Sequence, residues 1–153
     1  MAVLAWGKCS LESTPVTDGA PEIGATWTAM DIPKQDTTKL TPSAGEETTA
    51  QEEGGDLVDV RYGKTTYEFE FDMFVKKGKQ QPFTNNDGVV DGEHAIRLTP
   101  EDDTLEGIQI DRCKVRAEEN FSTKEGKWYH YVCKCLKPKT GNTIKPYTKT
   151  PGQ

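Results

Sequence analysis

The stretch TTYEFEFDMF, residues 65–74, alternates apolar and acidic side chains almost without a break. Successive side chains of a β-strand point to opposite faces, so this pattern predicts a strand with one face on a core. The face expected to point inward carries Tyr67, Phe69, Phe71 and Met73. The face expected to point outward carries Glu68, Glu70 and Asp72.

A row of three carboxylates first raises the possibility of catalysis. Neighbours on one face of a strand are about 7 Å apart, a spacing also found between the paired carboxylates of glycoside hydrolases. Such an enzyme needs one carboxyl group in an apolar pocket that raises its pKa. A polar face with Thr and Lys around it offers no such pocket, and no nucleotide-binding or hydrolase motif occurs elsewhere. We therefore expect no catalytic residues and no enzyme activity.

The rest of the chain also has the pattern of strands rather than helices. Short runs rich in β-branched and aromatic residues are separated by Gly, Pro, Asn and Asp, and no segment keeps a 3.6-residue period over three turns. Strands are expected at 3–11, 26–32, 57–63, 64–75, 94–99, 105–119 and 127–137. Between Ile110 and Cys113 the inward face changes, as a β-bulge would cause. The predicted class is all-β, either a β-sandwich or a partly closed antiparallel barrel with long loop or arm insertions.

The 153 residues are expected to form a single β domain with two arms. Residues 34–56 are almost devoid of large apolar side chains, so we predict a polar arm that is poorly ordered until a neighbouring molecule orders it. Residues 139–153 are predicted to form a C-terminal arm.

Charge is distributed unevenly along the chain, whose formal net charge is -6. This acidic balance argues against a nucleic-acid-binding protein, which needs Lys and Arg to neutralise phosphates. The first arm is acidic and the end of the chain is rich in Lys, so we expect these segments to pair, within one chain or between copies. The predicted subunit contacts are Glu46, Glu47, Glu52, Glu53, Lys137, Lys139 and Lys145.

The sequence indicates neither a metal site, nor a cofactor, nor a membrane span. Cys133 and Cys135 are too close for the usual zinc pair and have no second pair nearby, so the cysteines are expected to be free thiols. No apolar run approaches 18 residues, and the first residues show neither a basic segment nor an apolar run of signal-peptide length. We therefore expect synthesis in the cytoplasm.

The order of several phrases resembles a protein family. VLAWGKCSLE near the N-terminus, TKLTPSAGEETTAQEEGG, the alternating strand, NDGVVDGEHAIRLTPED and the KPKTG exit follow one another as in the tail tube (major tail) proteins of tailed bacteriophages. The resemblance covers roughly residues 3–140. Family members usually carry a flanking α-helix, whereas the corresponding stretch here, KKGKQQPFTNND, is short and interrupted by Gly and Pro.

The resemblance implies a structural protein of the virion tail, assembled in the cytoplasm of the bacterial host. Its subunits would form hexameric rings that stack into a hollow tube through which DNA passes without specific binding. Its partners would be further copies of itself and other tail proteins, including the tape measure. On this reading Glu68, Glu70 and Asp72 are predicted to face the lumen, where carboxylates repel the phosphates of the passing genome.

A second function from a different class is a monomeric β-sandwich that binds a carbohydrate or another surface ligand. Exposed aromatic side chains would form its binding platform, with Trp27, Trp128 and Tyr147 as candidates.

Overall fold

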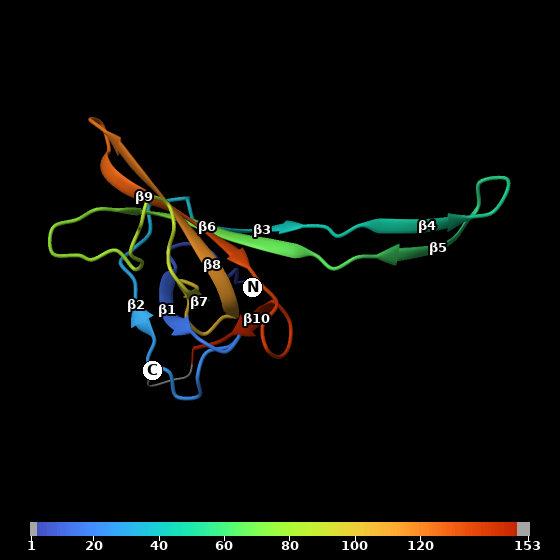
Figure 1. Cartoon of the computed structure of the whole chain (residues 1–153), viewed down its shortest axis with the longest axis horizontal. Helices are drawn as coiled ribbons and strands as arrows, with labels where there is room; N and C mark the ends of the chain where they lie inside the picture. Colours follow the sequence, from blue (N-terminus) through green and yellow to red (C-terminus); the bar gives the residue numbers. More distant parts are fainter. Residues whose placement is uncertain (1–2, 150–153) are drawn as a thin grey trace.

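The computed structural model describes residues 3–149, which form ten β-strands and no helix (Figure 1). The strands are β1 (Ser10–Val16), β2 (Thr28–Ala29), β3 (Lys39–Ser43), β4 (Glu47–Gln51), β5 (Leu57–Tyr62), β6 (Thr66–Phe74), β7 (Glu93–Thr99), β8 (Gly107–Ser122), β9 (Gly126–Cys135) and β10 (Ile144–Tyr147). The predicted all-β class is therefore confirmed.

Eight of these strands form one antiparallel sheet, in the order β2-β1-β7-β8-β9-β6-β3, with β10 paired to β8 outside this sequence. Strands β2 and β3 stand at the two ends of this order and are joined by residues 30–38. No ladder of hydrogen bonds connects them within the described residues, so the sheet is not closed into a barrel. Strands β4 and β5 form a separate two-stranded hairpin.

The alternation in residues 65–74 has the predicted effect in β6. The side chains of Phe69, Phe71 and Met73 are at most 1% exposed. Phe71 packs against Tyr131 of β9, with ring centroids 5.2 Å apart. The core also includes Leu11 from β1, so the sheet coils until distant strands share one core. Full burial of each large apolar side chain contributes about 1.5–3 kcal/mol, which makes β6 a main support of the fold.

The predicted β-bulge is present in β8. Cys113 lies opposite His94 and Ile110 lies opposite Ile96, so two residues of β8, one of them Asp111, face one residue of β7. Side chains of β8 point inward at Ile110 before the bulge and at Cys113 after it. A bulge places an extra residue between two ladder pairs and so reverses the side-chain alternation.

Two sequence-based predictions about the ends of the chain are wrong. The first strand is Ser10–Val16 rather than residues 3–11. It can continue through Pro15, which has no N–H to donate, because β2 pairs only with residues 12 and 13 and leaves Pro15 without a partner strand on that side. The C-terminal segment is not a free arm throughout, because β10 pairs with residues 107–110 of β8. The end of the predicted arm, residues 150–153, lies outside the described residues.

Residues 34–56 contain two strands and do not form one separate arm. The prediction that a neighbouring molecule orders this segment stays a prediction. Strand β3 belongs to the main sheet and pairs with β6, and β4 pairs with β5. The part that projects from the body is the hairpin of residues 46–62, which we call the arm (Figure 1). Backbone pairing thus orders a segment that contributes almost nothing to the apolar core.

Candidate functional site

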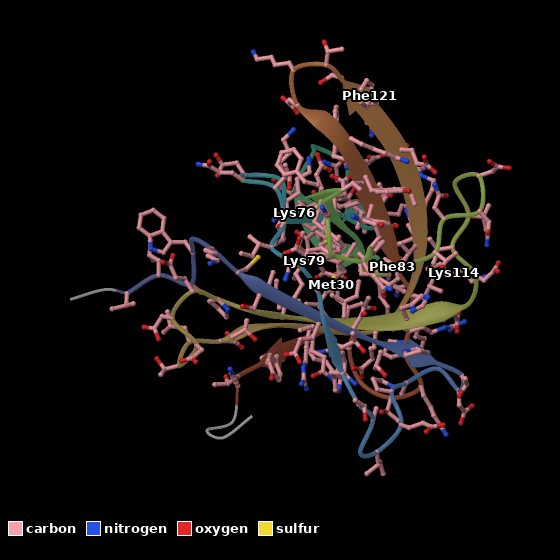
Figure 2. All side chains as sticks on the ribbon, turned by 90° about the vertical axis from the view of Figure 1, so that its left-hand side faces the viewer. Met30, Lys76, Lys79, Phe83, Lys114 and Phe121 are labelled. Carbon is pink, nitrogen blue, oxygen red and sulfur yellow. The ribbon has the colours of Figure 1, made fainter. Side chains whose placement is uncertain are left out.

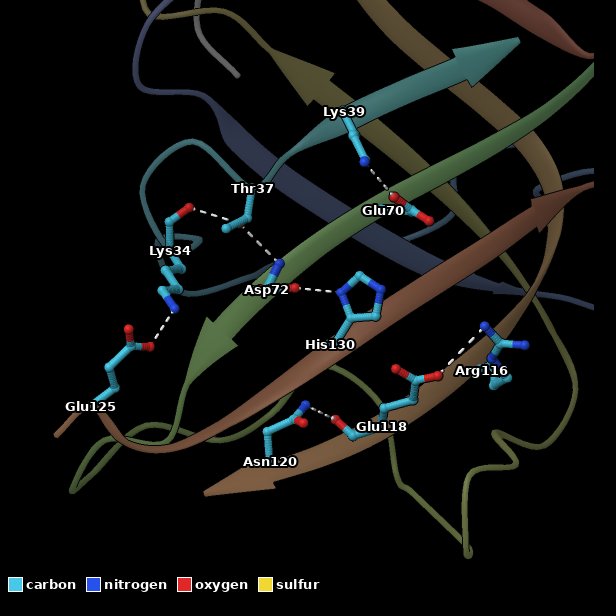
Figure 3. A network of polar contacts seen from close by, with 10 residues as sticks. All are labelled: Lys34, Thr37, Lys39, Glu70, Asp72, Arg116, Glu118, Asn120, Glu125 and His130. Carbon is cyan, nitrogen blue, oxygen red and sulfur yellow. Dashed lines mark hydrogen bonds and ion pairs between the residues drawn. The ribbon is translucent and has the colours of Figure 1, made fainter. Parts of the chain in front are cut away.

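The three carboxylates of β6 lie on the outward face, as predicted, but none stands alone. Glu68 pairs with Lys134 of β9 at 3.2 Å, and Glu70 pairs with Lys39 of β3 at 3.2 Å. Asp72 lies 2.5 Å from the Nδ1 atom of His130 (Figure 3). Each pair joins β6 to a neighbouring strand, so the three carboxylates help to hold the strands together as well as making this face polar.

The outward face shared by β3, β6, β9 and β8 is balanced in charge. Side chains directly opposite one another in the ladders point to the same face, which identifies its members. Its basic side chains, apart from His130, are Lys39, Lys114, Arg116 and Lys134. Its acidic side chains are Glu68, Glu70, Asp72 and Glu118. Any surface that this face lines is therefore close to neutral rather than acidic.

The segment before β3 is fastened to β6 at Asp72. The backbone N–H of Lys34 donates to the Asp72 carbonyl at 2.7 Å, and the backbone N–H of Asp72 donates to the Thr37 hydroxyl oxygen at 3.1 Å. The Thr37 hydroxyl in turn donates to the Lys34 carbonyl at 2.7 Å (Figure 3). Residues 34–43 are therefore part of the body of the domain, and only the arm projects from it.

Two glycines form the neck of the arm. A Cβ atom on Gly45 would lie 2.4 Å from the carbonyl carbon of Gly63, a distance that no real side chain tolerates. The N–H of Gly63 donates to the carbonyl of Glu46 at 2.7 Å. Only glycine allows the two segments of the arm to approach each other this closely where they leave the sheet.

The arm exposes apolar side chains that nothing in the described chain covers. Leu57, Val58 and Tyr62 are 56%, 58% and 74% exposed, and β4 and β5 make extensive contact only with each other. A two-stranded hairpin without a packed face is at best marginally stable in water. The arm therefore has the properties of a segment that packs against another molecule.

The acidic residues of the arm are available for such a contact. Four glutamates of the arm are exposed and make no ion pair with the described residues: Glu46, Glu47, Glu52 and Glu53. Their predicted role in subunit contacts stays a prediction.

The C-terminal lysines predicted to meet the arm differ from one another. Lys139 pairs with exposed Asp18 at 2.8 Å, whereas Lys145 pairs with Asp111, which is only 4% exposed. Lys137 is exposed and makes no ion pair with the described residues. Lys145 thus has a structural partner inside its own chain, which the sequence did not indicate.

The aromatic residues considered for a sugar platform each stack on a cation. The Arg97 guanidinium lies 4.3 Å from the Trp27 ring centre and 4.9 Å from that of Tyr147. The ammonium group of Lys34 lies 4.7 Å from the ring centre of Trp128. Cation–π contacts of this kind occupy ring faces that a carbohydrate would need. The structure thus gives no support to a carbohydrate site at these three residues.

The cysteines are free thiols, as predicted. Cys113, Cys133 and Cys135 are buried side by side in β8 and β9, and burial raises the pKa of the Cys135 thiol to about 12. Buried thiols with raised pKa values react poorly, so a role in packing fits them best. Within residues 3–149 no three His, Cys, Asp or Glu side chains are arranged to hold a metal ion.

One partly buried histidine should make stability depend on pH. The ring of His94 packs edge-on against Phe83 at 4.8 Å, and burial lowers its pKa although a hydrogen bond with the Asp91 carbonyl opposes this. The unfolded chain binds a proton at the ordinary pKa of about 6.5, whereas the folded chain does so only at lower pH. Stability should therefore fall as the pH decreases from 7.5 to 5.5. Urea unfolding at both pH values should show this loss in the native chain and a smaller one in His94→Gln; equal losses would contradict the assignment.

Comparisons with known proteins assign no family. No protein-family model matches the chain, and no curated protein matches it. The described residues contain no helix with the length and apolarity needed to cross a membrane.

Proposed function

We propose that this chain is a structural protein of a bacteriophage tail whose copies assemble into stacked rings and form the hollow tail tube. The observation that carries the proposal is the projecting arm, with its exposed Val58 and Tyr62 and its glutamates, which make no ion pair with the described residues. Ordering such a hairpin costs conformational entropy. A contact with a second copy offsets this cost, whereas solvent does not.

The shape of the molecule also favours assembly over ligand binding. A hairpin that extends away from the body can reach past one neighbour to another (Figure 1). When different surfaces meet head to tail, growth continues until a ring closes or a filament forms. Hexameric rings enter the proposal only through the resemblance of the sequence to tail tube proteins. So do the tape measure and other tail proteins as partners, and the location in the virion tail.

Purified protein at high concentration tests the proposal. We expect negative-stain electron microscopy to show rings or tubes, and sedimentation velocity to show a species far larger than the 17.0 kDa monomer. A chain that stays monomeric at all concentrations and salt conditions, yet is retained on a glycan column, would favour the binding module instead.

We keep the proposal that Glu68, Glu70 and Asp72 face the lumen, but as part of a charge-balanced wall rather than an acidic one. The charge-balanced face to which they belong would not attract phosphates, and a channel wall of this kind lets DNA slide. Replacing them with Gln, Gln and Asn should leave folding and tube formation intact, since partly exposed ion pairs contribute only about 0–1 kcal/mol each, but should slow genome passage.

Replacing the same three residues with Lys should slow genome passage more strongly. The wall would then become basic, and each new phosphate contact should add about 0.9 to the slope of DNA affinity against salt concentration, on logarithmic scales. DNA binding by assembled tubes at several salt concentrations measures this slope. A structure of the assembled form with the three side chains on its outer surface would contradict the lumen assignment.

A further inference from the structure

A cluster of lysines lies at the end of the molecule opposite the arm. It comes from three segments of the chain, and we call it the basic end: Lys34, Lys76, Lys77, Lys79, Lys124 and Lys127. These segments are neighbours in space, because the Val75 N–H donates to the Lys127 carbonyl at 3.0 Å and the Lys34 ammonium lies over the rings of Phe74 and Trp128. Figure 2 views this end directly and shows Lys76 and Lys79 on it.

Only half of these lysines are neutralised within the chain. Three carboxylates offset three of them, in the ion pairs Lys34–Glu125, Lys76–Asp31 and Lys127–Glu119. Lys77, Lys79 and Lys124 are exposed and make no ion pair with the described residues. The basic end also exposes the apolar side chains of Val75 and Phe121, which are 44% and 72% exposed.

The arm has the complementary properties. Between the two neck glycines it carries six carboxylates and one arginine: Glu46, Glu47, Glu52, Glu53, Asp56, Asp59 and Arg61. It also exposes Val58 and Tyr62. Opposite charges around exposed apolar groups are the pattern of two surfaces that bind each other.

The two surfaces cannot meet within one chain. The arm leaves the body just before β6 begins at Thr66, and the basic loop 76–79 follows just after β6 ends at Phe74. A nine-residue strand spans about 30 Å, and the arm extends in the direction away from the basic end (Figure 1). A contact between them must therefore join two copies.

We propose that the arm of one copy docks on the basic end of the next copy, and that this contact sets the head-to-tail direction of the assembly. The inference rests on the proposed function, and it names the surfaces that this function requires. It replaces the C-terminal lysines by the basic end as the partner of the arm, because Lys145 already neutralises Asp111 inside its own chain. Two different surfaces at opposite ends of one subunit allow open-ended growth.

Charge reversal with a matched control tests the contact. The end-reversed variant is Lys77→Glu, Lys79→Glu and Lys124→Glu, and the arm-reversed variant is Glu47→Lys, Glu52→Lys and Glu53→Lys. Each should raise the concentration needed for assembly by about tenfold or more, since facing like charges repel. A chain that carries all six changes should regain assembly. The control, Lys8→Glu, Lys137→Glu and Lys139→Glu, makes the same change in net charge elsewhere and should stay within about twofold of the native chain.

Zero-length cross-linking of the native chain provides a second readout. A carbodiimide joins carboxylates to amines that touch, and a mixture of light and heavy-isotope chains identifies links between copies. We expect links from arm glutamates to Lys77, Lys79 or Lys124, and we expect them to weaken as salt shortens the screening length below about 8 Å.

The outcomes separate this contact from the proposed function. Three outcomes would overturn the contact but not the proposed tube. The end-reversed and arm-reversed variants could assemble as well as the native chain, or the control could be as defective as the end-reversed variant. Cross-links of the arm to Lys137 in place of the basic end would be the third. A native chain that never assembles would overturn the proposed function itself.

Discussion

Excision of residues 46–62, with Gly45 joined directly to Gly63, should give a folded monomer that no longer assembles. The two glycines already lie in contact, so the join requires little movement of the body. Strand β3 stays paired with β6, and no buried core residue is lost. We expect the thermal midpoint to change by only a few degrees, as for other changes confined to an exposed hairpin. Assembly should be abolished, because the variant lacks the surface that the next copy would bind.

A longer deletion is the natural control for this experiment. Removal of residues 34–56, the arm as the sequence predicted it, would also remove β3 and the hydrogen bonds of Lys34 and Thr37 with Asp72. It should therefore unfold or strongly destabilise the domain. Sedimentation velocity and circular dichroism of both variants distinguish the two boundaries. Tubes formed by the shorter deletion would show that the arm is dispensable for assembly.

The sequence predicts the parts of this fold in which side-chain chemistry follows the backbone period. Alternation in β6 separates Phe69 and Phe71 from Glu68 and Glu70 because one face lies on the core. The bulge in β8 is visible for the same reason, since Ile110 and Cys113 break an otherwise regular period. A strand can be predicted from the sequence where burial of one face requires apolar side chains at regular positions.

The sequence does not predict β3 and β4, which bury little. The side chains of β4 are all exposed, and β3 contains Thr and Pro, so neither shows a periodic apolar pattern. Such strands are held by backbone hydrogen bonds. The backbone donor and acceptor are the same in every residue except proline, so these bonds leave no pattern in the sequence. The structure shows where these strands pair, and so defines the arm within the longer polar segment.

The basic end was missed for a different reason. Its lysines come from residues 34, 76–79 and 124–127, which the folding of β6 against β9 brings together. The run KKGK was a visible signal in the sequence, but a single short run of charge is usually a solvated loop. Only the three-dimensional arrangement places it opposite the acidic arm.

A single substitution at Lys145 is expected to destabilise the fold strongly. Its partner Asp111 occupies the bulge of β8, is 4% exposed, and accepts one further hydrogen bond, from the Gln109 side-chain amide at 2.8 Å. Lys145→Ala removes the counterion and leaves the Asp111 charge in a site with little water. Breaking a buried ion pair costs about 3–5 kcal/mol, and we expect about 3 because the Lys145 side chain is 28% exposed. The thermal midpoint should fall by about 10 °C.

Two further variants separate a missing counterion from a general loss of Lys145. The double variant Asp111→Asn with Lys145→Gln removes both charges and should recover much of the stability, because no uncompensated charge remains. Lys139→Ala breaks an ion pair with Asp18, whose side chain is 82% exposed, and should change the stability little because solvent screens such a pair. Urea unfolding of dilute, unassembled protein measures all three. If Lys145→Ala cost no more than Lys139→Ala, the pair would be a surface contact, and Lys145 would again be free to bind a neighbouring copy. If the expected difference is found, loss of assembly on mutation of Lys145 must be read as loss of the folded subunit.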